Sequence, residues 1–372
     1  MIPRFVCRAV RPLLPLLMLL PSSACRRQTA EVRPTIPLVR EILSARSDPR
    51  AQMLRDRETV PASDIAIIGS EFACERLAEL FLFRDVQDNV DARMHRDGLP
   101  DFAGETFACI EDPGTYAELL GARGSEELRR QTVLRVLAAL DTVAHISPYD
   151  QEGMAVKPSS KLVVLADPYL AEYGGFDVDT LLRSTGCRVP VLSPIETMIG
   201  HAFDRADRRD LSVGILCDPQ FARSGIYERI FARLAAERQM QGASVVVSGV
   251  TSRDSVLHVF LQDYVASGHT RPLDAILIDE LFVRPDSLKV ELAEIVSVMH
   301  ESSMTYGRLV SRDVFFLDAF DELSSACYKF LRQNNLFTHN IAKPQVTFYR
   351  PARKPGGEDG AIILIPGSYV QN

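Results

Sequence analysis

The feature that most constrains the fold is a regular alternation of short apolar runs with longer amphipathic stretches. Between positions 64 and 197 the runs are DIAIIG, TFACIED, KLVVLAD and RVPVLSP, and between 211 and 330 they are LSVGILCD, ASVVVSG, DAILIDE and VFFLDAF. Strands that alternate with helices predict parallel sheets covered by helices. The sequence therefore predicts an α/β fold of two pseudo-symmetric parallel-sheet domains that face a shared cleft. Domain A spans 61–197 and is completed by about 318–372, and domain B spans 198–317.

Carboxylates and small polar residues dominate the positions where these runs end. In open α/β sheets the ligand binds beyond the carboxyl ends of the strands, so these positions carry functional information. The alternative is that such acids cap the following helices, and for Asp112 and Asp318 the two interpretations stand side by side. A cap is less suited to Asp167, because Pro168 has no N–H to donate. The strand-end residues are Gly69, Ser70, Glu111, Asp112, Asp167, Ser193, Asp218, Asp279, Glu280 and Asp318.

The N-terminus has the composition of an export signal. Three arginines precede the apolar run PLLPLLMLLP, and small residues lead into Cys25. The run is short for a membrane span and contains prolines, which favours cleavage over a permanent anchor. Residues 1–24 are predicted as the signal peptide and 25–60 as a tether. Small residues before Cys25 resemble a bacterial lipobox, although Ser22 stands where leucine is preferred; the alternative is an ordinary signal peptide cut after Ala24.

Charge and cysteine spacing narrow the function classes. The formal net charge is −7 with acids and bases interleaved, so nothing favours nucleic acid as a partner. No cysteine spacing matches a zinc pattern, and we expect no metal and no cofactor. Five cysteines remain in the folded body, an odd number, which leaves at least one thiol unpaired: Cys74, Cys109, Cys187, Cys217 and Cys327. The lipobox implies a lipid attached to Cys25, and hence a membrane-attached protein of the cell envelope.

Five segments from position 64 to about 350 resemble glutamate racemase and the wider aspartate/glutamate racemase superfamily. The most specific is VGILCDPQFARSGIY, Val213 to Tyr227, which is similar to the family's VGVLAT-x-GTVRSGAY. VPVLSPIET resembles PVVGVIEP, DAILIDEL resembles DTLILGCT, and VFFLDAF resembles the strand that carries VDSA. EDPGTYAELLGARGSEELRR resembles GDTARVPYGxRSPEEVRR with two residues inserted. The resemblance implies the two-domain racemase fold and, since such racemases are often dimers, a homodimer.

The family's chemistry uses two cysteines that move the Cα proton from opposite faces of an amino acid. The first motif, ACNT, falls on Ala166 to Tyr169, so Asp167 replaces its thiol. The second motif, GCTH, falls on Asp279 to Phe282, so Glu280 replaces the other thiol. By the same resemblance the ligand-binding positions fall on Ser70, Gly121, Glu196 and Asp279. Cys74, which follows the first strand, is an alternative proton carrier, but it lies on a different strand from both missing cysteines.

With both thiols replaced, three hypotheses for the function of the protein remain. A carboxylate is a weaker proton acceptor than a thiolate by roughly four pKa units, or about 6 kcal/mol. The first hypothesis is therefore a non-racemising binding or interaction protein of the envelope with a degenerate active site. The alternative is an active amino-acid racemase or isomerase that uses Asp167 and Glu280 as an acid/base pair raised in pKa by burial. A solute-binding receptor that closes around a small amino-acid-like ligand is the second alternative.

Overall fold

The computed structural model describes residues 33–367 apart from 46, 56, 58, 148, 150–152, 252–253, 281, 302–307, 339 and 355–360, and apart from the side chains of 296 and 298–301. Residues from Thr35 onward form one compact unit. The predicted signal peptide and the Cys25 lipid site lie outside the described residues. Within the described part of the chain, no helix is both long enough and apolar enough to cross a membrane.

The first sheet has six strands, in the order β12-β11-β2-β1-β5-β6. All neighbours pair in parallel except β11 and β12, which are antiparallel. Because both faces of this sheet are covered, its central strands read as continuous apolar runs in the sequence. The bounds are β1 Asp64–Ser70, β2 Thr106–Asp112, β5 Ser160–Leu165, β6 Val191–Leu192, β11 Gln345–Arg353 and β12 Ile362–Pro366.

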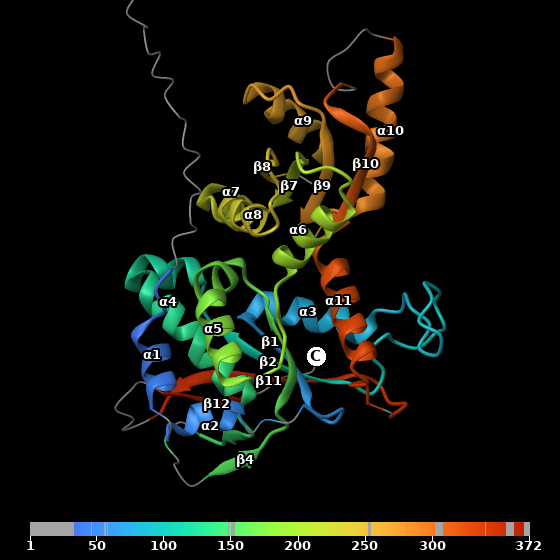
Figure 1. Cartoon of the computed structure of the whole chain (residues 1–372). Helices are drawn as coiled ribbons and strands as arrows, with labels where there is room; N and C mark the ends of the chain where they lie inside the picture. The colour runs from blue at the N-terminus through green and yellow to red at the C-terminus, as the bar shows by residue number, and fades with distance from the viewer. Residues whose placement is uncertain are drawn as a thin grey trace, which may run out of the picture. The chain divides into compact units, whose positions relative to one another are not determined.

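Strands from opposite ends of the chain lie side by side in this sheet. Figure 1 shows β11 and β12, in red, next to the blue and cyan strands β1 and β2. Residues Gln345–Tyr349 pair in register with Thr106–Ile110. The C-terminal segment therefore returns to the first sheet after the chain has built the second.

Helices cover both faces of the first sheet, as successive residues of β1 show. Ala66 and Ile68 point into a cluster with α4 and α5, whereas Ile65 and Ile67 point into a cluster with α3 and α11. This alternation follows from the two-residue period of a strand. The helices are α3 Glu71–Phe83, α4 Tyr116–Leu140, α5 Gly175–Thr185 and α11 Ala319–Gln333, with the π-helix η1 Leu170–Gly174 before α5 and the hairpin β3 Val143–His145 and β4 Met154–Val156 after α4.

The second sheet is all parallel, in the order β10-β9-β7-β8. Ile215 of β7 shares the apolar cluster of β1, while Leu216 packs with α9 and α10 on the other face. One buried cluster thus runs continuously from the first sheet to the second. The elements are β7 Ser212–Cys217, β8 Ser244–Gly249, β9 Leu273–Asp279 and β10 Val310–Asp318, with α6 Pro194–Arg205, α7 Pro219–Ser224, α8 Ile226–Glu237, α9 Val256–Ala266 and α10 Pro285–Glu301. The α/β class with two parallel-sheet halves predicted from the sequence is confirmed.

The tether predicted over 25–60 is wrong for its second half. Two short helices, α1 Pro37–Ser44 and α2 Pro49–Arg55, bury apolar side chains in the core of the first sheet, among them Val39, Ile42 and Leu54, each 0% exposed. The Ile36 N–H also donates to the buried Asp177 carboxylate at 3.0 Å. The prediction failed because these helices are too short to be stable alone and gain their stability from packing.

Candidate functional site

A cavity of about 570 Å³ opens beyond the carboxyl ends of strands from both sheets. Its walls come from the starts of α3 and α4, the segment after β5, the loop after β7, the end of β9 and Phe320 of α11. This volume lies in the range typical of small-molecule sites. Seven carboxylates line it, and Arg76 is the single basic residue among the described lining residues. The acids are Glu71, Glu75, Asp112, Asp167, Asp218, Asp279 and Glu280.

Asp167 is the most deeply buried of the acids that line the cavity. Its residue is 6% exposed, and its Oδ1 accepts a hydrogen bond from the Tyr169 N–H at 2.8 Å. Its Oδ2 accepts no hydrogen bond from any described residue. The pKa of Asp167 is raised from 3.8 to about 7, chiefly by burial. The negative charges of Asp279 and Asp112 contribute to this rise, and the hydrogen bond from the Tyr169 N–H opposes it. Asp167 therefore titrates near neutral pH.

The chain directly after Asp167 holds this carboxylate in place. Pro168 is followed by the π-helix η1, a conformation that is frequent at functional sites. Gly174 ends this turn against α4, where an added Cβ would lie 2.3 Å from the Thr132 Cβ. Only a glycine allows so close an approach. The segment is thereby fixed on α4, and Asp167 is fixed with it.

Asp112, at the end of β2, is committed to a structural network. The Arg135 guanidinium binds it with two hydrogen bonds, at 2.7 and 2.6 Å, and the Tyr116 hydroxyl donates to its Oδ2. Tyr116 is 2% exposed, and the Arg135 side chain 8%. Asp112 is thus neutralised by a buried ion pair rather than acting as a helix cap, and its charge is not available to a ligand.

Asp279 and Glu280 bring the second sheet's acids to the cavity. The hydroxyl of the buried Tyr227 donates to Asp279 Oδ2. Burial raises the pKa of Asp279, which the Tyr227 bond and the Arg76 charge oppose. Asp167, Asp279 and Glu280, three residues singled out from the sequence, therefore line one cavity.

Arg76 is the lining residue that sequence reasoning missed. Its guanidinium carbon lies 4.2 Å from the centroid of the Phe320 ring, and it donates no hydrogen bond to a described residue. Burial lowers the pKa of Arg76, while the charges of Asp279, Asp318 and Glu280 oppose the shift. Nothing in the local sequence marks this residue, because an arginine on an amphipathic helix is ordinary; only the fold brings α11 against α3.

The remaining predicted ligand positions divide between the cavity and the surface. Ser70 lines the cavity, and its hydroxyl caps α3 by accepting from the Ala73 N–H at 3.4 Å. Glu196 does not line it and instead pairs with Arg233. Gly121 is exposed on the first turns of α4, away from the cavity lining. The structure therefore brings Ser70 to the candidate site and leaves Glu196 and Gly121 out.

Two strand-end acids act as helix caps. Asp318 Oδ1 accepts from the N–H groups of Phe320 and Asp321, and Asp218 accepts from the Gln220 N–H. The buried Asp318 carboxyl has its pKa raised from 3.8 to about 6, chiefly by burial. The cap interpretation of Asp318 offered by the sequence is the one that the structure supports.

No thiol lines the cavity among its described residues. All five cysteines of the described chain are free, and the rival candidate Cys74 is fully buried, with its Sγ toward the carbonyls of Ile67 and Ile110. A hydrogen bond with Cys109 and burial raise the pKa of the Cys74 thiol far above its ordinary value. Cys74 is thus excluded as a proton carrier at this site.

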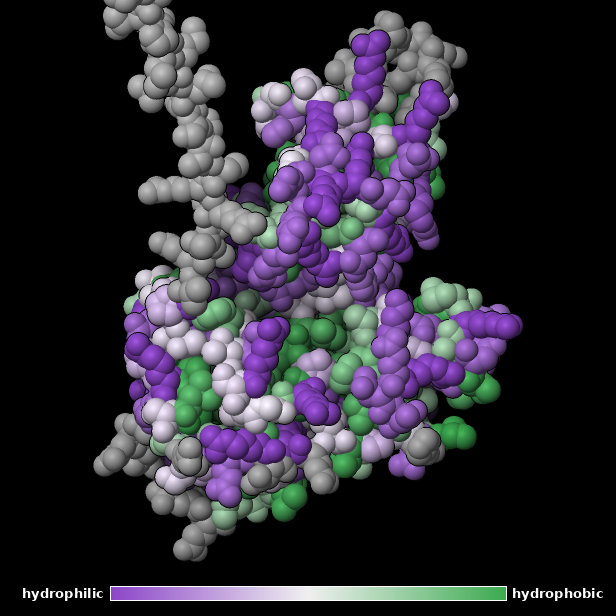
Figure 2. Space-filling view, in the orientation of Figure 1, coloured by the Kyte–Doolittle hydropathy of each residue, from purple (hydrophilic) through white to green (hydrophobic). Residues whose placement is uncertain are grey.

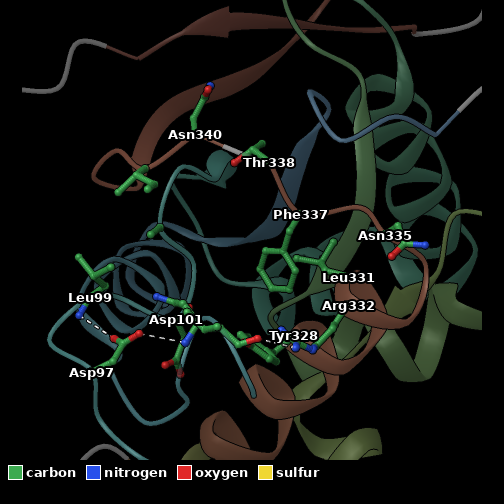
Figure 3. Close-up of a pocket in the computed structure, with 14 residues that line it drawn as sticks. Asp97, Leu99, Asp101, Tyr328, Leu331, Arg332, Asn335, Phe337, Thr338 and Asn340 are labelled. Atoms are coloured by element: carbon green, nitrogen blue, oxygen red, sulfur yellow. Dashed lines mark hydrogen bonds between the residues drawn. The ribbon is translucent and has the colours of Figure 1, made fainter. Parts of the chain in front are cut away.

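A second cavity, of about 600 Å³, is lined by the C-terminal end of α11, by the segment that follows it and by the loop between α3 and β2. Figure 2 shows hydrophobic residues on this loop, which carries the exposed side chains Val90 and Met94. Tyr328 and Phe337 lie together on one wall, with ring centroids 5.0 Å apart (Figure 3). Its polar groups hold the loop together, since Asp97 accepts from the amides of Asn89 and Leu99 and Arg332 donates to the Val90 carbonyl.

Comparison with known proteins gives glutamate racemases as structural neighbours. One from Francisella tularensis in complex with D-glutamate is 15% identical, with a TM-score of 0.46, and the match covers 78% of this chain and 89% of that one. An isoform from Bacillus anthracis is 13% identical, with a TM-score of 0.43 and the same coverage. One from Aquifex pyrophilus is 13% identical, with a TM-score of 0.38, 76% of this chain and 87% of that one. No family model and no curated protein matches. Likenesses this distant do not bear on the chemistry of the cavity.

Proposed function

We propose that this chain is an exported, lipid-anchored protein of the bacterial cell envelope that binds a small ligand between its two sheets and does not racemise amino acids. One observation carries the proposal. Asp167 and Glu280, which stand where the sequence resemblance expects two proton-carrying cysteines, both line a cavity of about 570 Å³ that is open to a ligand. The cavity is therefore present, but the two cysteines that the racemase reaction uses do not line it among the described residues.

The chemistry of the walls argues against racemisation of an acidic amino acid. A two-thiol reaction needs a sulfur on each side of Cα, and no described cysteine lines the cavity. The lining acids also disfavour a ligand with two carboxylates, since like charges near a partly buried site repel each other by about 3–4 kcal/mol at 4–5 Å. A binding role for a different small molecule is the simplest function that fits these walls.

Deuterium exchange at Cα tests this proposal. The full chain, purified in detergent, is incubated in D₂O with L- and D-forms of glutamate, aspartate, alanine and lysine, and Cα–H loss is followed by NMR. We expect no exchange above that of a heat-inactivated sample. Exchange on any of these compounds that disappears in Asp167→Asn contradicts the non-racemising role.

An active isomerase is the second candidate, and the titration of Asp167 favours it. A general acid or base works best with a pKa near the working pH, and burial raises the pKa of Asp167 to about 7. Glu280 is the proposed partner for the opposite face. This candidate requires that Asp167→Asn and Glu280→Gln each abolish exchange, whereas a contaminating racemase leaves the activity unchanged in both variants.

Attachment through Cys25 is tested separately from the cavity. Cells that express the full chain are labelled with an alkyne analogue of palmitate, and the purified protein is analysed for the label. We expect labelling of the wild type and none in Cys25→Ser. Secretion of an unlabelled wild-type protein that begins at Cys25 would instead support an ordinary signal peptide.

A further inference from the structure

Acidic residues outnumber basic residues among the described residues that line the cavity. Asp112 is neutralised by Arg135, and Asp218 is partly used as the cap of α7. The same space has a single described lining cation, Arg76, and five further acids: Glu71, Glu75, Asp167, Asp279 and Glu280. No group of three or more described acids, histidines or cysteines is arranged to hold a metal ion. The charge is therefore distributed along the walls rather than focused on one point.

Asp167 offers a fixed carboxylate to a ligand in the cavity. Its residue is 94% buried, its Oδ1 is held by the Tyr169 amide, and its Oδ2 is left without a described partner on the cavity side. An ammonium group of a ligand would donate a charge-assisted hydrogen bond to this oxygen, in surroundings that are largely desolvated.

Aromatic rings add a second feature that suits a cation. Tyr169 and Phe221 lie 6.0 Å apart, centroid to centroid, and line the cavity with Phe72 and Phe282. An ammonium group over an aromatic face gains about 0.5–2 kcal/mol, depending on its desolvation. The same rings also accommodate the methylene chain of a ligand.

Arg76 provides the complementary contact for one anionic group. It is anchored over Phe320, so its position is fixed, and its N–H groups donate to no described residue. A guanidinium in this state is suited to a carboxylate, which it can bind with two parallel hydrogen bonds. The cavity thus combines one site for a carboxylate with several sites for ammonium groups.

We infer that the ligand is a basic amino acid or a close analogue, with one carboxylate bound by Arg76 and two amino groups bound by Asp167 and the acids at the end of β9. The inference rests on the proposed small-ligand function and names the ligand's chemical class. A dicarboxylic amino acid has the wrong charge balance for these walls, and a simple diamine lacks the group that Arg76 would bind.

Ligand-observed NMR with a matched panel tests the inference on the full chain. The probes are L-lysine, D-lysine, L-norleucine, cadaverine and L-glutamate. We expect at least one lysine enantiomer to bind about tenfold or more tighter than norleucine, cadaverine or glutamate, because each lost charge-assisted contact costs about 1.5–3 kcal/mol. Arg76→Gln should weaken lysine but not cadaverine, and Asp167→Asn should weaken both. Glu294→Gln, on the exposed face of α10, is the matched control and should change neither.

The outcomes distinguish this inference from the function on which it rests. Equal or tighter binding of glutamate or norleucine that is lost in Asp167→Asn overturns the basic ligand and leaves a small-ligand cavity. Binding of lysine that is unaffected by Asp167→Asn and Arg76→Gln places it elsewhere and overturns the inference. If none of the five probes binds, the basic ligand is overturned, whereas the small-ligand function, which names no ligand class, is not.

Discussion

The Arg135 guanidinium binds the Asp112 carboxylate with two parallel hydrogen bonds, from Nε to Oδ2 at 2.7 Å and from Nη2 to Oδ1 at 2.6 Å. This pair joins the interior of α4 to the end of β2, and the Tyr116 hydroxyl completes it from the start of the same helix. An acid at the rim of the cavity is thereby turned into a structural element. Asp167, whose carboxylate is held by the Tyr169 amide instead of an arginine, remains the acid best placed to bind a ligand.

Removal of Arg135 should be strongly destabilising. In Arg135→Met the Asp112 carboxylate stays buried without its main counter-charge, and we expect a loss of about 3–5 kcal/mol in the free energy of unfolding. Urea denaturation followed by circular dichroism measures this. Arg183→Met, which breaks the exposed pair with Asp179, serves as the control, with an expected change within about 0.5 kcal/mol. A loss in Arg135→Met no larger than in the control would show that Asp112 is not held by this pair.

Asp167 should make the protein less stable as pH rises. Its pKa of about 7 in the folded state lies above the ordinary 3.8, so the folded state keeps a proton that the unfolded state releases. The free energy of unfolding therefore falls between about pH 4 and 7, by about 4 kcal/mol for three pKa units. Asp167→Asn removes this contribution and should be more stable than the wild type at pH 8.

Denaturation at pH 4, 6 and 8 checks the Asp167 prediction. Asp279 and Asp318, whose pKa values are also raised, keep part of the slope in the variant. The exposed Asp179→Asn is the control and should follow the wild-type profile. Parallel pH profiles for Asp167→Asn and the wild type would contradict a buried, neutral-titrating carboxyl at 167.

The Lys161–Glu105 pair should be essential for the first sheet. Both side chains are 0% exposed, with Nζ and Oε2 2.6 Å apart, and Lys161 also donates to the carbonyls of Pro61 and Leu336. We expect Lys161→Met to lose about 3–5 kcal/mol by urea denaturation, because an unpaired charge and two carbonyls remain buried. Lys289→Met, at an exposed pair, should be nearly neutral. If a higher salt concentration restored the free energy of unfolding of Lys161→Met to the wild-type value, Lys161 would be solvated rather than buried.

Gly214 should be required by close packing in β7. A Cβ there would lie 2.4 Å from the Phe260 ring, so Gly214→Ala should cost about 1–3 kcal/mol by overpacking. Phe260→Leu removes the colliding ring atoms, and the double variant should lose less than the sum of the two single variants. Thermal or urea unfolding of the four proteins gives the coupling. Strict additivity would mean that the two residues do not meet.

The alternation of apolar runs and amphipathic stretches was sufficient to predict the α/β class, since a strand and a helix impose different periods on the residues they bury. It also located the strand ends, and with them Asp167, Asp279 and Glu280. It did not predict the docking of α1 and α2, whose short apolar faces have meaning only against α5 and the buried Asp177.

Only the tertiary structure determined the charge and the hydrogen-bond partners of each strand-end acid. Asp112 and Asp167 look alike in the sequence, each at the end of an apolar run and next to a proline. Arg135 lies 23 residues after Asp112 and neutralises it, whereas Asp167 is buried with one oxygen left without a described partner. The charge and pKa of a carboxyl depend on groups that folding brings near it, and those groups come from distant parts of the chain.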